Sequence, residues 1–319
     1  MSNKLPVAPS FAVIIRAAGE RTEDECFKIV KEQVDKQASV SIVRKKPFKE
    51  ALEECFRIGI ASQKKWLITV DADMILLPGA IELLVREAEN MPENYLQLQG
   101  KIIDKITGTV RKAGPRIYRI SLLKRVLDRS KSFDDHIRPE SRLITHFGKS
   151  GNPSRYISAI LCLHDYEQYY KDIYRKSYVH ARKHPELLSE MIQRAISFKK
   201  EDPDYQVMLQ AIWDSLNEEM SVGIDTRLFE SKSQKALIKL QLNEKLKANS
   251  EVKLNNYILE NSDHFPLNLL QNKLVPYTDQ PAGNKKRNLI QLLFGSGIQG
   301  ILHRVGGVLI KTGKKLQIN

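Results

Sequence analysis

Residues 66–78 read WLITVDADMILLP, an apolar run interrupted by two acids that lie one residue apart. Alternate residues of a β-strand share a face, so Asp71 and Asp73 at the end of such a strand can both approach one ion. Carboxylate oxygens suit Mg²⁺ and Mn²⁺, which can also keep water ligands for a phosphate to displace. The run therefore predicts a buried strand that ends at a divalent-metal site.

The segments around this run alternate between strand and helix patterns. A short apolar run at 11–15 suits a buried parallel strand, 39–43 is the second predicted strand, and apolar residues recur at helical spacing after each. Thr22 and Glu25 have the spacing of a capping box at the start of the first helix. This order predicts an α/β fold with a mostly parallel sheet flanked by helices, and ligands of such sheets bind beyond the carboxyl ends of the strands.

The segments FAVIIRAAGERT (11–22) and PFKEALEECFRIGIASQKKWLITVDADMILLPGAIELL (47–84) resemble the nucleotide-sugar half of family 2 glycosyltransferases, which have the GT-A fold. The resemblance covers residues 11–90 well and extends more loosely to residue 180 or so. It implies a GT-A-type, Rossmann-like sheet. It also implies that Asp71-Ala72-Asp73 holds Mn²⁺ or Mg²⁺ against the diphosphate of a nucleoside diphosphate sugar.

The chain departs from the family's pattern where the nucleoside would bind. No acid follows the second strand, which continues Val43-Arg44-Lys45-Lys46, and the first strand runs into Arg16-Ala-Ala-Gly-Glu20-Arg21 instead of Pro-x-x-Asn. We expect Arg16, Glu20 and Arg21 to contact the base, ribose or phosphates of the donor, because guanidinium groups match phosphate oxygens. The chain also lacks Gln-x-x-Arg-Trp and membrane spans, and so is unlike a processive polysaccharide synthase.

An inverting sugar transfer, which the resemblance implies, needs a carboxylate that accepts a proton from the acceptor hydroxyl. The candidates lie in FDDHIRPESRLITHFG (133–148): they are Asp134, Asp135 and Glu140, and no pattern separates them cleanly. We favour Glu140, because Pro139 stiffens the chain before it. An exposed charged loop is the alternative for this segment.

Another apolar run, at 160–163, ends at His164 and Asp165. Enzymes of the GT-A fold frequently bring a histidine back to the metal, and neutral imidazole is acceptable to Mn²⁺. The resemblance therefore implies His164 as a metal ligand beside Asp71 and Asp73, with Asp165 orienting its ring. A structural histidine is the alternative.

The rest of the chain divides by composition. Tyrosines recur at helical intervals between 166 and 178, where they either pack in a core or stack on a sugar, and further helix patterns follow. We expect a catalytic domain at 1–170, a helical appendage at 171–254, and a linker with a basic, apolar tail at 255–319.

Basic residues exceed acidic residues by 51 to 38, a net charge of +13, and seven of the basic residues lie in 280–319, which holds no acid. Alternating basic and apolar residues at 285–315 suit an anionic membrane surface, whereas no nucleic-acid-binding motif accompanies the charge. A frayed, soluble tail is the alternative.

The three cysteines are too few for a disulfide framework, and the sequence shows no secretory signal. We expect a cytoplasmic protein, peripheral at the inner face of the membrane through this tail.

These patterns and the resemblance together predict an enzyme. It would be a metal-dependent, non-processive glycosyltransferase that moves a single sugar, with inversion, from a nucleoside diphosphate sugar to a hydroxyl acceptor. The expected acceptor is a bacterial surface or lipid-linked glycan. A sugar nucleotidyltransferase and a catalytically inactive, membrane-associated scaffold are the alternatives.

Overall fold

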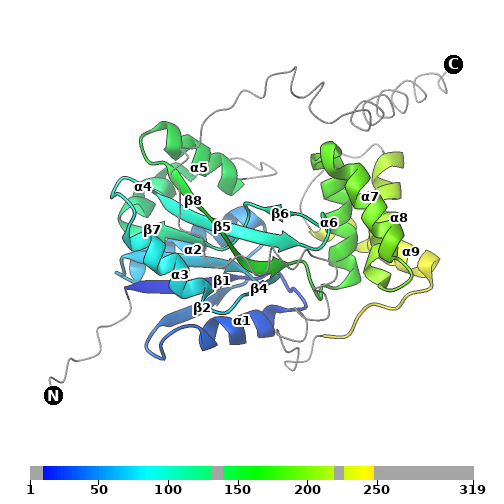
Figure 1. Cartoon of the computed structure of the whole chain (residues 1–319), viewed down its shortest axis with the longest axis horizontal. Coiled ribbons are helices and arrows are strands. Elements are labelled where there is room, and N and C mark those ends of the chain that lie inside the picture. Colours follow the sequence, from blue (N-terminus) through cyan, green and yellow to red (C-terminus); the bar gives the residue numbers. More distant parts are fainter. Residues whose placement is uncertain (1–9, 131–138, 219–225, 248–319) are drawn as a thin grey trace. The chain divides into compact units, whose positions relative to one another are not determined.

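The computed structural model describes residues 10–130, 139–218 and 226–247 (Figure 1). The strands in these ranges are β1 (Phe11–Arg16), β2 (Ser39–Val43), β3 (Trp66–Asp71), β4 (Met74–Leu76), β5 (Gln97–Asp104), β6 (Val110–Arg111), β7 (Arg116–Arg119) and β8 (Ser154–His164). The helices are α1 (Glu23–Glu32), α2 (Phe48–Ala61), α3 (Ala80–Glu89), α4 (Ile120–Ser130), α5 (Pro139–Lys149), α6 (Tyr170–Lys183), α7 (Leu188–Phe198), α8 (Pro203–Asn217) and α9 (Glu230–Leu240), with short 3₁₀ turns η1 (Pro185–Leu187) and η2 (Thr226–Phe229).

The eight strands of the described residues form one mixed sheet in the order β2-β1-β3-β7-β5-β8-β4, with β6 paired to β5. β1 is parallel to β2 and β3, and β5 is parallel to β8, whereas β4, β6 and β7 run antiparallel to their neighbours. Five of these strands therefore share one direction. The predicted α/β fold, with a mostly parallel sheet flanked by helices, is confirmed.

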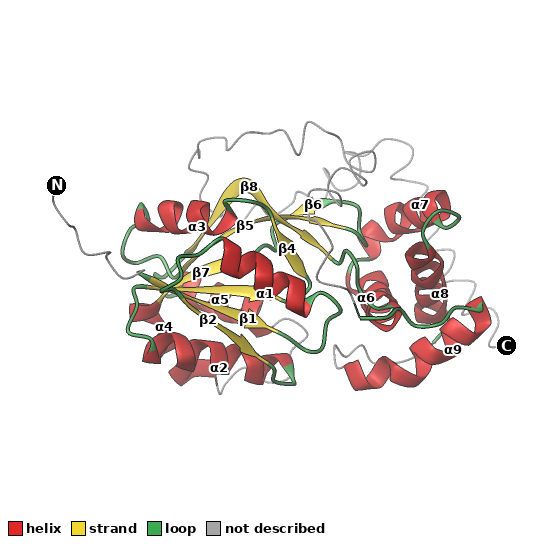
Figure 2. Ribbon diagram, turned by 90° about the horizontal axis from the view of Figure 1, so that it is seen from below, coloured by secondary structure: helices red, strands yellow, loops and turns green. Residues whose placement is uncertain are grey.

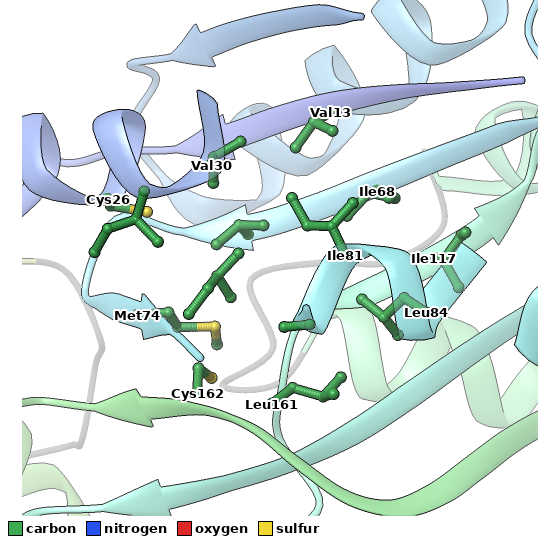
Figure 3. Close-up of a cluster of buried hydrophobic side chains, with 14 of the residues drawn as sticks. Val13, Cys26, Val30, Ile68, Met74, Ile81, Leu84, Ile117, Leu161 and Cys162 are labelled. Carbon is green, nitrogen blue, oxygen red and sulfur yellow. The ribbon is translucent and has the colours of Figure 1, made fainter. Parts of the chain in front are cut away.

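Helices cover both faces of the sheet (Figure 2). On one face, Cys26 of α1 and Leu84 of α3 belong to the same buried cluster as Ile68 of β3 (Figure 3). On the other face, residues of α2, α4 and α5 form a second cluster, in which the rings of Phe56 and Tyr118 meet edge to face with centroids 5.2 Å apart. β1 and β3 are apolar along their length because both of their faces are covered.

The helices α6, α7, α8 and α9 form a helical part of their own beside the carboxyl ends of β5 and β8 (Figure 1). Their shared core includes Tyr174 and Tyr178, which are almost fully buried, so the tyrosine repeat packs these helices together. Lys105, directly after β5, joins this part to the sheet, because its Nζ lies 2.8 Å from Asp202.

The capping box expected from Thr22 and Glu25 is not formed. No side chain caps the start of α1, and the Thr22 hydroxyl instead donates a hydrogen bond of 2.8 Å to the carbonyl oxygen of Ala72. A tertiary contact has replaced the local one. It fixes the start of α1 against the turn that holds Asp71 and Asp73.

Several predictions concern residues outside the described ranges. They are the candidate bases Asp134 and Asp135 and the linker and tail at 255–319, including the membrane-binding segment 285–315. The three domain boundaries stay predictions. Among the described helices, none combines the length and the apolar character that crossing a bilayer would require.

Candidate active site

The carboxyl ends of β5 and β8 lie beside the turn between β3 and β4. The strand register pairs Asp104 with His164 across β5 and β8, and Met74 with His164 across β4 and β8. The backbone N–H of Asp165 donates to the carbonyl oxygen of Asp73 over 3.3 Å. Three segments that are distant in sequence therefore bring Asp73, Asp104, His164 and Asp165 to one edge of the sheet.

Three of these side chains form a group that can hold a metal ion. One ligand atom from each of Asp73, His164 and Asp165 lies within 4.8 Å of the others, and His164 Nε2 is 3.6 Å from Asp73 Oδ1. Asp73 Oδ1 is buried and accepts no hydrogen bond from the described residues. A buried carboxylate oxygen without a donor is costly unless a cation balances it. Carboxylate and imidazole donors fit Mn²⁺ or Mg²⁺, so these residues fit such an ion.

His164 is oriented through its second ring nitrogen. Nδ1 lies 3.0 Å from Asp104 Oδ2 and 3.1 Å from Asp165 Oδ2, which leaves Nε2 to face Asp73. Burial lowers the pKa of His164, but the charges of Asp165 and Asp73 and the contact with Asp104 outweigh it and raise the pKa to about 10. Without a metal ion, the imidazole is therefore protonated at neutral pH.

Lys176 of α6 adds a second cation to this group. Its Nζ contacts both Asp73 Oδ2 and Asp165 Oδ1, and its side chain is only 11% exposed. Burial lowers the pKa of Lys176, but the charges of Asp165 and Asp73 outweigh it and raise the pKa above its ordinary value. Burial in turn raises the pKa of Asp73, whereas Lys176 and His164 hold it below its ordinary value. The lysine is charged and the carboxylates are ionised.

The side chains of Asp71 and Asp73 contact different residues, although only Ala72 separates the two acids in the sequence. Asp71 Oδ1 accepts a hydrogen bond of 2.7 Å from Arg16 Nε. Within the described part of the chain, the metal-binding group contains Asp165 and not Asp71. A role for Asp71 as a metal ligand, and for Arg16 toward the donor, stays a prediction.

Glu140, the favoured candidate base, is buried between two arginines. Its Oε1 accepts hydrogen bonds from Arg16 Nη1 at 3.0 Å and from the Tyr118 hydroxyl at 2.5 Å, and its Oε2 contacts Arg116 Nη1. Burial raises the pKa of Glu140, but Arg116, Arg16 and the Tyr118 hydrogen bond outweigh it and lower the pKa. A carboxylate with both oxygens engaged and a lowered pKa is a weak proton acceptor. These contacts favour a structural role.

The other two candidates for donor binding follow β1. Glu20 Oε2 accepts a hydrogen bond of 2.5 Å from the backbone N–H of Ala18, and burial and the charge of Asp73 raise the pKa of Glu20 to about 7. Arg21 forms an ion pair with Glu167. Neither contact tests a role toward the donor, which stays a prediction.

A cavity of about 130 Å³ lies between the turn after β1 and helix α6. Three cations, Lys46, Lys171 and Arg175, line it together with the acids Asp172 and Glu230. Arg175 Nη2 also lies 3.6 Å from Asp172 Oδ1, and Arg175 precedes Lys176 in α6. The lining therefore has one more cation than acid, and a positively charged hollow at the carboxyl end of a sheet suits an anionic ligand.

Sequence reasoning identified Asp73 and His164 but missed Asp104 and Lys176. Asp104 also ends a strand, but only Ile102 and Ile103 precede it as apolar residues, so the apolar-run signal of His164 is weaker there. Nothing in the sequence marks Lys176, since a lysine on an amphipathic helix is ordinarily solvated.

No protein-family model and no curated protein sequence matches this chain. Among solved structures, the chain is similar to the mannosyltransferase PcManGT from Pyrobaculum calidifontis in complex with GDP-Man and Mn²⁺, with a TM-score of 0.39 and 12% identity over 81% of this chain and 80% of that one. A glycosyltransferase involved in glycosylation of the major capsid of PBCV-1 matches with a TM-score of 0.36 and 10% identity over 49% of this chain and 93% of that one. The 4-diphosphocytidyl-2C-methyl-D-erythritol synthase from Anaerococcus prevotii also matches, with a TM-score of 0.36 and 12% identity over 49% of this chain and 89% of that one. Because these TM-scores are low, we base the function on the side chains of the site.

Proposed function

We propose that this chain is a metal-dependent glycosyltransferase that moves one sugar from a nucleoside diphosphate sugar to a hydroxyl acceptor. The observation that supports it is the group of Asp73, His164 and Asp165 at the strand ends, next to a cavity lined by Lys171 and Arg175. A diphosphate leaving group needs positive charge on several oxygens. The metal-binding group and the cationic cavity supply it from two sides.

Each part of the site has a role in this proposal. Asp73, His164 and Asp165 would hold Mn²⁺ or Mg²⁺, whose charge stabilises the leaving diphosphate. Lys171 and Arg175 would bind phosphate oxygens from the side of α6. The acceptor is a surface or lipid-linked glycan, and the basic segment of the tail would hold the enzyme at an anionic membrane.

A carboxylate has to accept the proton of the acceptor hydroxyl. Both oxygens of Glu140 already contact cationic or hydroxyl groups. Asp134, Asp135 and Glu140 stay the candidates for this proton acceptor, and Glu140 also holds Arg16 and Arg116 in place.

The proposal is tested by thermal unfolding with UDP-, GDP-, CMP- and dTDP-sugars, each with and without Mn²⁺. A ligand present at a hundred times its Kd stabilises the folded state by about 2.7 kcal/mol, which raises Tm by roughly 4 °C in a chain of this size. We expect one donor to do so only with Mn²⁺, and Asp73→Asn to remove the effect. The matched control is Asp128→Asn, an exposed acid on α4, which should behave as the wild type. Stabilisation that survives in Asp73→Asn would contradict the proposed metal site.

The released product separates the proposal from its alternatives. A glycosyltransferase releases a nucleoside diphosphate, whereas a sugar nucleotidyltransferase releases pyrophosphate. A scaffold would release neither, and would bind no nucleotide in a metal-dependent manner.

A further inference from the structure

The ammonium group of Lys176 contacts the same two carboxylates, Asp73 and Asp165, that would bind a metal ion. It contacts one oxygen of each carboxylate, and both carboxylates are buried. His164, the third member of the metal-binding group, faces the other oxygen of Asp73 at 3.6 Å. The chain therefore carries its own cation in the group that suits a divalent ion.

A divalent ion and this ammonium cannot both stay in place. An ion bound to the same carboxylate oxygens as Lys176 would lie in direct contact with the ammonium, and the repulsion between them is weakly screened because the group is buried. The Lys176 side chain has four rotatable bonds and a compact charge, so it can leave by rotation without any movement of α6. A ligand that offers the ammonium other anionic partners would therefore allow the metal to bind.

The cavity beside α6 offers the ammonium another place. Lys171 and Arg175 line that cavity and stand on the same helix as Lys176. Lys176 itself is not part of that lining, and it follows Arg175 by one residue. Phosphate oxygens bound by Lys171 and Arg175 would be the new partners of the Lys176 ammonium in place of Asp73 and Asp165.

We propose that Lys176 is a resident cation that keeps the metal-binding group assembled and occupied until a diphosphate arrives. This inference rests on the proposed function, because it assumes that the group binds a divalent ion. The ammonium then moves from Asp73 and Asp165 to the phosphate oxygens, and the metal takes its place. Metal and donor therefore bind with positive coupling, and each raises the affinity of the other by the same factor.

The test is the affinity for Mn²⁺ alone, measured by the electron paramagnetic resonance signal of free Mn²⁺ in protein titrations. We expect the wild type to bind Mn²⁺ weakly, and Lys176→Met to bind it at least tenfold more tightly, since the competing cation is gone. The matched control is Lys239→Met, an exposed lysine on α9, which should leave the affinity unchanged. Damage to the fold would lower the affinity for Mn²⁺, so a gain is specific to the proposed competition.

Each other outcome of the titration contradicts part of the proposal. If the wild type binds Mn²⁺ and Lys176→Met binds it no more tightly, the role of Lys176 is refuted while the metal-dependent function stands. If neither protein binds Mn²⁺, and the wild type still binds none with a nucleoside diphosphate sugar present, both are refuted. A gain that persists when Asp73→Asn is added to Lys176→Met would place the ion elsewhere and also refute the inference.

Removal of Lys176 leaves Asp73 and Asp165 buried without their ammonium partner, and a variant that does not fold without metal needs a second measurement. In that case its folding is followed by circular dichroism during a titration with Mn²⁺, beside Lys176→Gln, which keeps a neutral hydrogen-bond donor. Folding that is restored by Mn²⁺ supports the exchange of lysine for metal. Folding that Mn²⁺ does not restore in either variant contradicts it.

Discussion

Replacement of Glu140 by glutamine tests whether this carboxylate has a structural or a catalytic role. Glu140 is 5% exposed and lies between Arg16, which is equally buried, and Arg116. The amide of Glu140→Gln keeps the shape and can still accept the Tyr118 hydrogen bond, but it removes the charge. Arg16 then keeps only Asp71 as a counter-ion among the described residues.

The magnitude follows from the burial of these charges. Removing one partner of a buried ion pair costs about 3 to 5 kcal/mol, because the other charge stays buried without compensation. Each kcal/mol lowers Tm by roughly 1.5 °C in a chain of this size, so we expect a decrease of about 5 to 8 °C. Tyr118→Phe, which removes only the hydroxyl that donates to Glu140, is the control and should cost about 2 kcal/mol.

The pH dependence checks the origin of this effect. The pKa of Glu140 is lowered in the folded state from 4.5, so the stabilisation by its charge is complete above pH 4.5 and is lost as the pH falls through the lower folded-state value. The difference in urea-unfolding free energy between wild type and Glu140→Gln should therefore be constant near neutral pH and shrink in acid. A variant as stable as the wild type, but without transferase activity, would refute the structural role and restore Glu140 as the base.

Two further predictions test the core and the charge around the site. Gly100→Ala places a Cβ inside the contact distance of Leu161, which is 1% exposed and closely packed, so we expect a loss of about 1 to 3 kcal/mol in urea unfolding. Combined with Leu161→Ala, the loss should be less than the sum of the two single changes, and strict additivity would contradict the predicted clash. The pKa of Glu20 is raised from 4.5 to about 7, so in metal-free protein Glu20→Gln should match the wild type below pH 4.5, become increasingly more stable than it as the pH rises from 4.5 to about 7, and keep a constant advantage above that pH. One pKa unit corresponds to about 1.4 kcal/mol, which limits the gain to about 3.5 kcal/mol, and no gain at pH 8 in chelator would contradict the burial of this acid.

Local patterns were enough to predict the framework of the fold. The apolar runs of β1 and β3 and the helical spacing after them predicted these elements to within a few residues, because burial on both faces of a parallel sheet demands apolar strands. The edge strand β2 is less buried, and its mixed sequence SVSIV was still enough to place it. The expectation that ligands bind beyond the carboxyl ends of the strands also singled out Asp73 and His164, because each follows or ends an apolar run of a strand. The capping box at Thr22 failed, because a tertiary hydrogen bond to Ala72 replaced the local one.

The sequence by itself therefore determined the α/β framework and the strand ends that carry acids, since both depend on periodicity within short segments. Only the tertiary structure decided the partner of each acid. Asp71 pairs with Arg16, whereas Asp73 faces His164 and Lys176, although only Ala72 separates the two acids in the sequence. The register of β5 against β8 and the position of α6 set these contacts, and both depend on packing between residues far apart in sequence. Charge–charge interactions fall off with distance, so the chemistry of the site follows from this packing and not from the order of residues in the chain.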